Sequence, residues 1–217
     1  MNITKLSTII ATKAWGGKMA TVFGRPSVVY RPRGSGDPIV PGHVVLTPMV
    51  AIDSVNTFKF TTPQSFGKPT FFAAFDARLA RIGDYLVQDQ DIYFLVTIDD
   101  IAPPQLTRCN RRVTLLRTLN TPKAGLMPYG GTTAGNEAPR FMCWPASVLE
   151  KSKGDRGDMG LPGDKKFGNV EMILPVSLPD VPRTSDIITD DLSRRFVVTS
   201  AEQTFMGWRV LAQQVAA

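Results

Sequence analysis

Two segments of the chain carry nearly the same alternation of apolar and polar positions. Residues 84–97 read DYLVQDQDIYFLVT, and residues 186–199 read DIITDDLSRRFVVT. In each segment, two runs of β-branched, aromatic and other apolar residues flank a short polar stretch, which is the pattern of a β-hairpin. The predicted arms are 85–87 and 92–97 around a turn in 88–91, and 187–189 and 194–199 around a turn in 190–193.

The two hairpins align without a gap. The alignment matches Asp84 with Asp186, Asp89 with Asp191, Phe94 with Phe196, Val96 with Val198 and Thr97 with Thr199. The same register then aligns a third strand-like run, residues 106–113, with residues 208–215. A register shared by three strands predicts two similar small β-barrels in tandem.

The N-terminal stretch has a different pattern. Apolar residues within 5–23 recur at roughly helical spacing, with Gly16-Gly17 in the middle and Gly24-Arg25-Pro26 after the end. This pattern predicts a helical arm that is interrupted at the glycine pair. Beyond the arm, prolines recur too often for helices, and β-branched runs at 27–30 and 43–47 predict strands.

The predicted fold is therefore mostly β, with two small β-barrel-like domains in tandem, an N-terminal helical arm and long loops. Glycines 154, 157, 160 and 163 recur with the period of collagen, and we interpret this segment as an exposed loop, with a trimeric collagen-like plug as the alternative. The predicted organisation is an arm at 1–24, a first β domain at 25–120, a linker or long loop at 121–139, and a second β domain at 140–217 with the Gly-X-Y-like loop at 153–168.

Composition agrees with a folded protein and says little about partners. The chain has 217 residues, 43% hydrophobic, and a net charge of +6 that suits DNA, a membrane surface or an acidic protein. No apolar run approaches the ~20 residues of a membrane span, and the N-terminus lacks the apolar core of a secretory signal. We interpret Cys109 and Cys143 as two reduced, buried thiols, with a disulfide between them as the alternative. An intracellular or virion-borne protein fits these features best.

Few residues could carry catalysis. His43 is the only histidine, so a histidine metal site or a Ser-His-Asp triad would depend on one ring. The acidic pairs Asp99-Asp100 and Asp190-Asp191 follow a strand and lie in a predicted turn, where Asp is favoured for its local backbone hydrogen bonds. We therefore expect no enzyme, no catalytic, cofactor-binding or metal-binding residues, and no cofactor.

The most basic run is 108–117, which we place on the third strand of the first barrel. Strand alternation divides its arginines into two pairs on opposite faces, Arg108 with Arg112 and Arg111 with Arg117. The charge would then not gather in one groove. Tyr93 and Phe94 are adjacent and also face opposite sides, so only one of them could stack on a base. A nucleic-acid-binding protein built on OB-like β-barrels is thus the alternative function.

Several phrases in the chain resemble neck proteins of tailed bacteriophages and prophages, the head-closure or head–tail connector family. They are Gly83-Asp84-Tyr85-Leu86 followed by Tyr93-Phe94-Leu95-Val96, and Ser185-Asp186-Ile187-Ile188 followed by Arg194-Arg195-Phe196-Val197-Val198 and Gly207-Trp208-Arg209. The resemblance covers the arm and both hairpins. The tandem barrels and the collagen-like loop depart from a minimal head-closure barrel.

This resemblance implies a structural virion protein at the head–tail junction, made in the host cytoplasm. Identical subunits, six or twelve of them, would form a ring between the portal or adaptor protein and a tail terminator, tube or other tail protein. Double-stranded DNA would pass through the lumen, which the ring helps to close or gate, and no membrane would be involved. Head-closure, adaptor and tail-completion roles stay open.

Candidate residues for contacts with partners or DNA fall into two groups. The first is the arginine set Arg108, Arg111, Arg112 and Arg117, whose charge suits acidic partner surfaces or DNA. The second is the set of apolar loop residues Met127, Tyr129 and Leu161, which a neighbouring subunit could bury.

Overall fold

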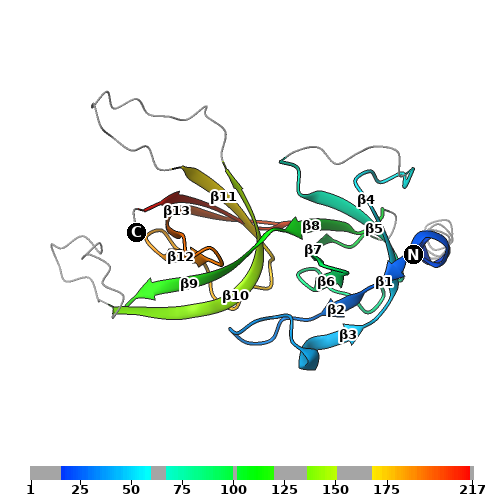
Figure 1. The fold of residues 1–217 in the computed structure, drawn as a ribbon, viewed down its shortest axis with the longest axis horizontal. Coiled ribbons are helices and arrows are strands. Elements are labelled where there is room, and N and C mark those ends of the chain that lie inside the picture. The colour runs from blue at the N-terminus through cyan, green and yellow to red at the C-terminus, as the bar shows by residue number, and fades with distance from the viewer. Residues whose placement is uncertain (1–15, 60–66, 100–101, 120–135, 151–167, 216–217) are drawn as a thin grey trace, which may run out of the picture.

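The computed structural model describes residues 16–59, 67–99, 102–119, 136–150 and 168–215, and the fold is mostly β, as predicted (Figure 1). Residues 16–23 are helical, and the short 3-10 helix η1 spans Pro41–His43. The strands are β1 (Arg25–Pro26), β2 (Val28–Tyr30), β3 (Val44–Leu46), β4 (Met49–Asp53), β5 (Thr70–Ala74), β6 (Tyr85–Gln88), β7 (Asp91–Thr97), β8 (Gln105–Cys109), β9 (Arg111–Thr118), β10 (Glu137–Glu150), β11 (Asn169–Leu174), β12 (Ile187–Asp190), β13 (Arg195–Thr204) and β14 (Gly207–Gln214). Both predicted hairpins are confirmed, as β6–β7 and β12–β13.

The first eight strands form a curled sheet in the order β1-β4-β5-β8-β7-β6-β2-β3. β1 pairs with β4 and β2 pairs with β3, and between these pairs the Ser27 amide donates to the Pro48 carbonyl at 2.9 Å. The stretch β1–β2 therefore runs antiparallel to β3–β4 along its whole length. Pro48 has no amide hydrogen, so the ladder loses one bond at this point without opening. We call the strands from β1 to β8 the first barrel.

The remaining strands form a closed barrel in the order β10-β11-β14-β13-β12-β9, which we call the second barrel. If β9 is set against β1–β2 and β10 against β3–β4, the two barrels have the same strand order. β10 is long enough to pair with β9 through its first part and with β11 through its last residues. β10 thus makes as one continuous strand the pairings that β3 and β4 make as two.

Cross-strand partners extend this correspondence to single residues. Partners in the first barrel, each followed by its counterpart in the second, are Arg25–Val50 and Arg111–Ala146, Val29–Leu86 and Leu115–Ile188, Ala51–Ala74 and Ser147–Ile173, and Phe71–Leu106 and Val170–Ala212. The ladder even shifts register at matching points, after Leu95 in β7 and after Val198 in β13. The second barrel repeats the first strand by strand.

The ungapped alignment of the hairpins is correct before the turn and wrong after it. Tyr85 lies opposite Phe94, whereas its counterpart Ile187 lies opposite Val197. Phe94 therefore corresponds to Val197 and not to Phe196, and the matches at Val96 and Thr97 fail in the same way. The cause is the length of the turn, which is one residue longer in the second hairpin. In the first hairpin Gln88 pairs with Asp91, whereas in the second the Asp190 amide donates to the carbonyl of Arg194.

The alignment of residues 106–113 with 208–215 is also wrong. Leu106 lies opposite Leu95, and Ala212 lies opposite Val198, so Leu106 corresponds to Ala212. The β13–β14 hairpin extends further than the connection between β7 and β8, and this extra length shifts the register of the third strand.

The boundary between the barrels lies at Asn110, so the predicted first domain at 25–120 is too long. β9 pairs with β10 and β12 of the second barrel, and residues 137–139, predicted as linker, belong to β10. Asn110 is itself bonded to the second barrel, because its amide donates to the Ala146 carbonyl at 3.0 Å and its side chain donates to the Val148 carbonyl at 2.8 Å. Most of the predicted linker, and all but residue 168 of the Gly-X-Y-like loop, lie outside the described residues.

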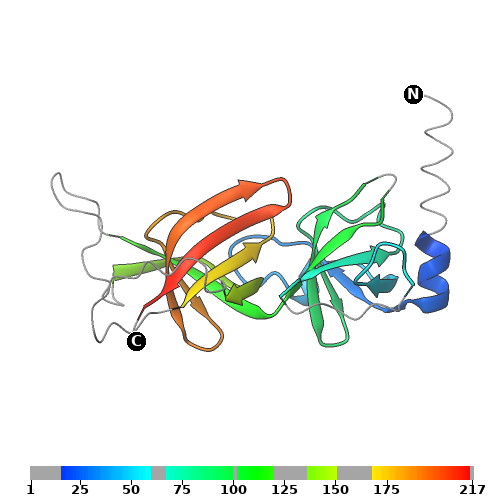
Figure 2. The same cartoon turned by 90° about the horizontal axis from the view of Figure 1, so that it is seen from above.

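The predicted helix ends at residue 23, before Gly24, as expected. Gly16 and Gly17 are themselves helical, and the residues before them, which a test of the predicted interruption needs, lie outside the described residues. The helix lies at the end of the molecule beyond the first barrel and buries Ala20 in that barrel's core (Figure 2). In the described part of the chain no helix is long and apolar enough to cross a membrane.

Two main clusters of buried side chains fill the molecule. One lies inside the first barrel and includes Phe71, Leu86 and Tyr93. The other fills the second barrel and also takes in Tyr85 and Phe94, which belong to β6 and β7 of the first. Tyr93 and Phe94 do face opposite sides of the strand, and both sides are buried. The two barrels lie side by side along the long axis with an apolar contact between them (Figure 1).

Candidate functional site

Arg117, one of the predicted contact residues, lies in a buried network at the end of β9. Its guanidinium donates to both carboxylate oxygens of Asp186 at 2.8 Å, to Asp180 at 2.9 Å and to the Val181 carbonyl at 2.8 Å. The Asp186 side chain is only 4% exposed and also accepts the Arg183 amide at 2.8 Å. Arg117 therefore fixes the start of β12 against β9 and is not a free surface charge.

Arg31, which follows β2, makes the same network in the first barrel. Its guanidinium donates to both oxygens of Asp84, at 3.1 and 2.8 Å, and to the Leu79 carbonyl at 2.8 Å. Asp84 is 3% exposed at its side chain and accepts the Arg81 amide at 2.8 Å. Each contact has its counterpart around Arg117, so the bidentate pair is part of the repeat.

These hydrogen bonds further favour the charged form of both guanidinium groups. The bond to Asp186 raises the pKa of Arg117 above its ordinary value, and the bond to Asp84 raises the pKa of Arg31. Burial opposes both shifts and is outweighed. A buried carboxylate needs such a partner, because an unpaired buried charge is costly.

The other three predicted arginines also make ion pairs within the chain. Arg112 of β9 reaches Asp37 of the first barrel at 2.6 Å, and Arg111 approaches Asp191 at 3.9 Å. Arg108 pairs with Asp91 on β8 and β7, where both side chains are 42% exposed. The strand that carries Arg111, Arg112 and Arg117 is thus the first of the second barrel, not the third of the first, and each of the four arginines pairs with a different carboxylate.

Met127, Tyr129 and Leu161, the apolar candidates, lie outside the described residues. Sequence reasoning missed the role of Arg31 as the counterpart of Arg117. A signal was present: Arg25 and Arg31 bracket β1–β2 with the same spacing as Arg111 and Arg117 on β9.

A junction between the barrels is built from Gly83 and Tyr85 of the first and Trp144, Pro145 and Ser177 of the second. The Tyr85 hydroxyl donates to the Pro145 carbonyl at 2.8 Å, and the Ser177 hydroxyl donates to the Gly83 carbonyl at 2.8 Å. The rings of Tyr85 and Trp144 meet edge to face with centroids 6.1 Å apart, a favoured aromatic geometry. Burial raises the pKa of Tyr85 well above its ordinary value, which keeps its hydroxyl a donor.

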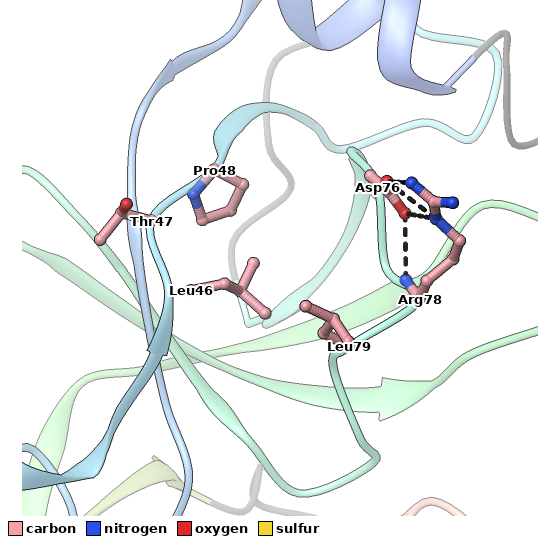
Figure 3. Close-up of a pocket in the computed structure, with 6 residues that line it drawn as sticks. All are labelled: Leu46, Thr47, Pro48, Asp76, Arg78 and Leu79. Carbon is pink, nitrogen blue, oxygen red and sulfur yellow. Dashed lines mark hydrogen bonds and ion pairs between the residues drawn. The ribbon is translucent and has the colours of Figure 1, made fainter.

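The first barrel carries a hollow of about 490 Å³, lined by Leu46, Thr47, Pro48, Asp76, Arg78 and Leu79 (Figure 3). Leu46 and Leu79 point toward one another across it, and Asp76 and Arg78 pair with each other beside it. The hollow lies between the β3–β4 stretch and the connection from β5 to β6. With its charges already paired, it offers an apolar surface.

Large apolar side chains are exposed on both barrels. Phe205, in the turn of the β13–β14 hairpin, is 82% exposed, and Leu79 beside the hollow is 68% exposed. Val22 on the helix is 70% exposed. Apolar residues in such positions are candidates for contacts with other proteins.

The described residues hold no group of histidine, cysteine and carboxylate side chains that could bind a metal. Asp190 accepts the Leu192 and Arg194 amides within its own turn, as the turn interpretation predicts. Cys109 and Cys143 are both free, and Cys143 is exposed, contrary to the prediction that both are buried. Burial raises the pKa of the Cys109 thiol, so this sulfur stays protonated and weakly nucleophilic.

Comparisons with protein-family models, with curated proteins and with solved structures gave no match. The fold itself therefore defines the class: a mostly β protein with a curled, barrel-like sheet and a closed six-stranded barrel in tandem.

Proposed function

We propose that this chain is a structural protein of the neck of a tailed bacteriophage or prophage. Its subunits form a ring between the DNA-filled head, contacted through the portal or adaptor protein, and the tail, and help to close or gate the DNA channel. The role is one of assembly and not of catalysis.

The junction between the barrels is the observation that carries this proposal. Between described residues, four hydrogen bonds or ion pairs cross it: Tyr85 to Pro145, Ser177 to Gly83, Arg112 to Asp37, and the Met142 amide to the Ser35 carbonyl at 2.8 Å. With the buried apolar contact, they favour a single stiff body over two domains on a hinge. A stiff spacer with loops at both barrel ends suits a subunit that must hold two neighbours at a set distance.

The residues that carry the resemblance to neck proteins have a physical role in this fold. Asp84 and Asp186 of the two matching phrases are the buried partners of Arg31 and Arg117. Gly83 and Ser185, which precede them, have φ of 87° and 73°, a left-handed conformation that starts the hairpin strand. The phrases therefore describe how such a barrel is built, and this supports the resemblance at the level of architecture.

The test is the composition and structure of virions from a host that carries the phage. Mass spectrometry of purified particles should find the chain, and cryo-EM of the head–tail junction should place both barrels in a ring. A particle that lacks the chain would rule out the neck role. The ring symmetry would also settle whether six or twelve subunits are present.

The alternative, a nucleic-acid-binding protein, is disfavoured by the ion pairs of the four predicted arginines. Arginines that bind phosphates need free guanidinium donors. Three of the four, Arg108, Arg112 and Arg117, already donate to carboxylates, and the fourth, Arg111, lies 3.9 Å from the Asp191 carboxylate. Fluorescence anisotropy with a labelled single-stranded and a labelled duplex oligonucleotide checks this. Tight binding that weakens steeply with added salt would favour the alternative.

A further inference from the structure

The hollow in the first barrel is the counterpart of the site in the second barrel that the junction fills. Tyr85 docks against Trp144 and Pro145, and the β-ladders match these residues with Pro48 and Met49. Pro48 lines the hollow, and Met49, which follows it, is exposed.

The other wall of the hollow also has its counterpart at the junction. Ser177, which holds Gly83, lies on the connection from β11 to β12. The equivalent connection, from β5 to β6, contributes Asp76, Arg78 and Leu79 to the hollow. Val181 and Leu79 anchor the two connections, since the carbonyl of each accepts a hydrogen bond from the corresponding arginine. The wall formed by Pro48 and Met49 is thus open in the first barrel, whereas Tyr85 covers its counterpart in the second. Leu79 and its counterpart Val181 are exposed in both barrels.

The filled position shows what kind of group the open one suits. In the second barrel it holds an aromatic side chain, Tyr85, supplied by the neighbouring barrel. The hollow likewise has an apolar lining, with Leu46 and Leu79 facing one another (Figure 3). Within the described residues Phe205 is the most exposed large apolar side chain, and it lies at the tip of the β13–β14 hairpin, which extends further than its counterpart, β7 and β8, in the first barrel.

We propose that the hollow binds Phe205 of a second copy of this chain. The first barrel of one copy and the second barrel of the next then meet in a head-to-tail contact, the kind that generates rings when the rotation closes. This inference rests on the proposed neck function, because it names one contact of the ring, but it makes a separate claim about which surfaces meet.

Matched substitutions test the contact by native mass spectrometry and light scattering of the purified chain. Phe205→Asp and Leu79→Asp should each weaken self-association roughly tenfold or more, as loss of an interface anchor does. The controls are Leu192→Asp, at the tip of another hairpin, and Val181→Asp, the counterpart of Leu79, both at exposed positions. The controls should associate like the unchanged chain, and thermal unfolding checks that all four variants are folded.

Cross-linking tests the geometry independently. In a chain carrying Cys143→Ser, one preparation receives Phe205→Cys and another Leu79→Cys, and the two are mixed and oxidised. A covalent dimer is expected only in the mixture, and not when Val181→Cys replaces Leu79→Cys.

Each other outcome counts against the contact in a distinct way. Oligomers that resist both Asp variants and give no cross-link would overturn it while leaving the ring to other surfaces. A chain that stays monomeric at every concentration would overturn it because no second copy binds. If Leu79→Asp blocks incorporation into virions but Phe205→Asp does not, another protein occupies the hollow. The neck role itself fails only if virions lack the chain.

Discussion

The two barrels share strand order, register and buried ion pairs, yet they differ in how they meet their surroundings. The second barrel is closed by the unbroken β10, and the first barrel packs against it through Tyr85. The first barrel divides the same strand at Thr47-Pro48 and leaves the corresponding position open. In this molecule the repeated core is kept, and the differences gather where one unit contacts another.

The difference teaches which interactions build the barrel and which ones serve contacts. Arg31–Asp84 and Arg117–Asp186 recur because each one ties the first strand to the start of the hairpin. Tyr85 has no aromatic counterpart, since Ile187 takes its place in the second barrel. The ion pairs that the two barrels share therefore build the barrel, whereas Tyr85, which only the first barrel has, makes the contact between the barrels.

The largest expected effect is on the free energy of unfolding, when the arginine of either buried ion pair is removed. Arg117→Ala should lower the free energy of unfolding by about 3–5 kcal/mol, because it leaves the Asp186 carboxylate buried without its cation. Arg31→Ala should cost somewhat less, since Arg117 also holds Asp180. Urea unfolding followed by tryptophan fluorescence measures both.

A double variant is the control for this prediction. Arg117→Ala combined with Asp186→Ala removes the stranded charge, so its cost should be smaller than the sum of the single costs. If the free energy of unfolding of the Arg117→Ala variant lies within about 1 kcal/mol of that of the unchanged chain, the pair is not buried in the way described.

The next effect tests the junction through a glycine. A Cβ on Gly83 would lie 2.7 Å from the Ser177 hydroxyl oxygen, and the φ of 87° is strained for a side chain. Gly83→Ala should therefore cost about 1–3 kcal/mol. Ser185→Ala, at the counterpart position, should be nearly neutral because a side chain is already present there. Equal costs in thermal unfolding would argue against the close contact with Ser177.

Much of this architecture could be predicted from the sequence, and its failures have physical causes. Alternation of apolar and polar residues identifies β6–β7 and β12–β13 because a half-buried strand has a period of two. One extra residue in the turn that contains Asp191 shifts every later position, and the coincidence of Phe94 with Phe196 concealed this shift.

The barrel boundary and the contact residues were harder to predict. Asn110 alone separates β8 from β9, and no composition change marks it. The arginines of β9 looked like surface charge because their partners, such as Asp186 and Asp37, lie far away in the chain. The hollow depends on two connections that come together only in the folded barrel, so no local pattern points to it.

A smaller effect on stability depends on pH, because the first barrel has a tyrosine where the second has a phenylalanine. Burial and the nearby Asp91 carboxylate raise the pKa of Tyr93 to about 12. Its counterpart in the second barrel is Phe196, which does not titrate. An unfolded tyrosine ionises near pH 10, so the contribution of Tyr93 to stability is complete below about pH 10 and is lost as the pH rises toward about 12.

The expected loss of stability from Tyr93 is ~1–2 kcal/mol. Unfolding midpoints measured between pH 8 and about 11 check it, with Tyr93→Phe as the variant that should show a weaker fall. The fall will not vanish in this variant, because Tyr85 is also buried with a raised pKa. A Tyr93→Phe profile that superimposes on that of the unchanged chain would contradict the assignment.

The smallest effect concerns the second ion pair that the barrels share. Arg25 pairs with Asp89 at 3.2 Å in the first barrel, and their counterparts Arg111 and Asp191 lie 3.9 Å apart in the second. Arg25 and Asp89 are largely exposed, so Arg25→Ala should change the free energy of unfolding by at most about 0.5 kcal/mol. Arg111→Ala should cost slightly more, since Arg111 is less exposed. Urea unfolding at low and high salt checks both values, and a cost near that of Arg117→Ala would mean that position in the repeat, and not burial, sets the strength of a pair.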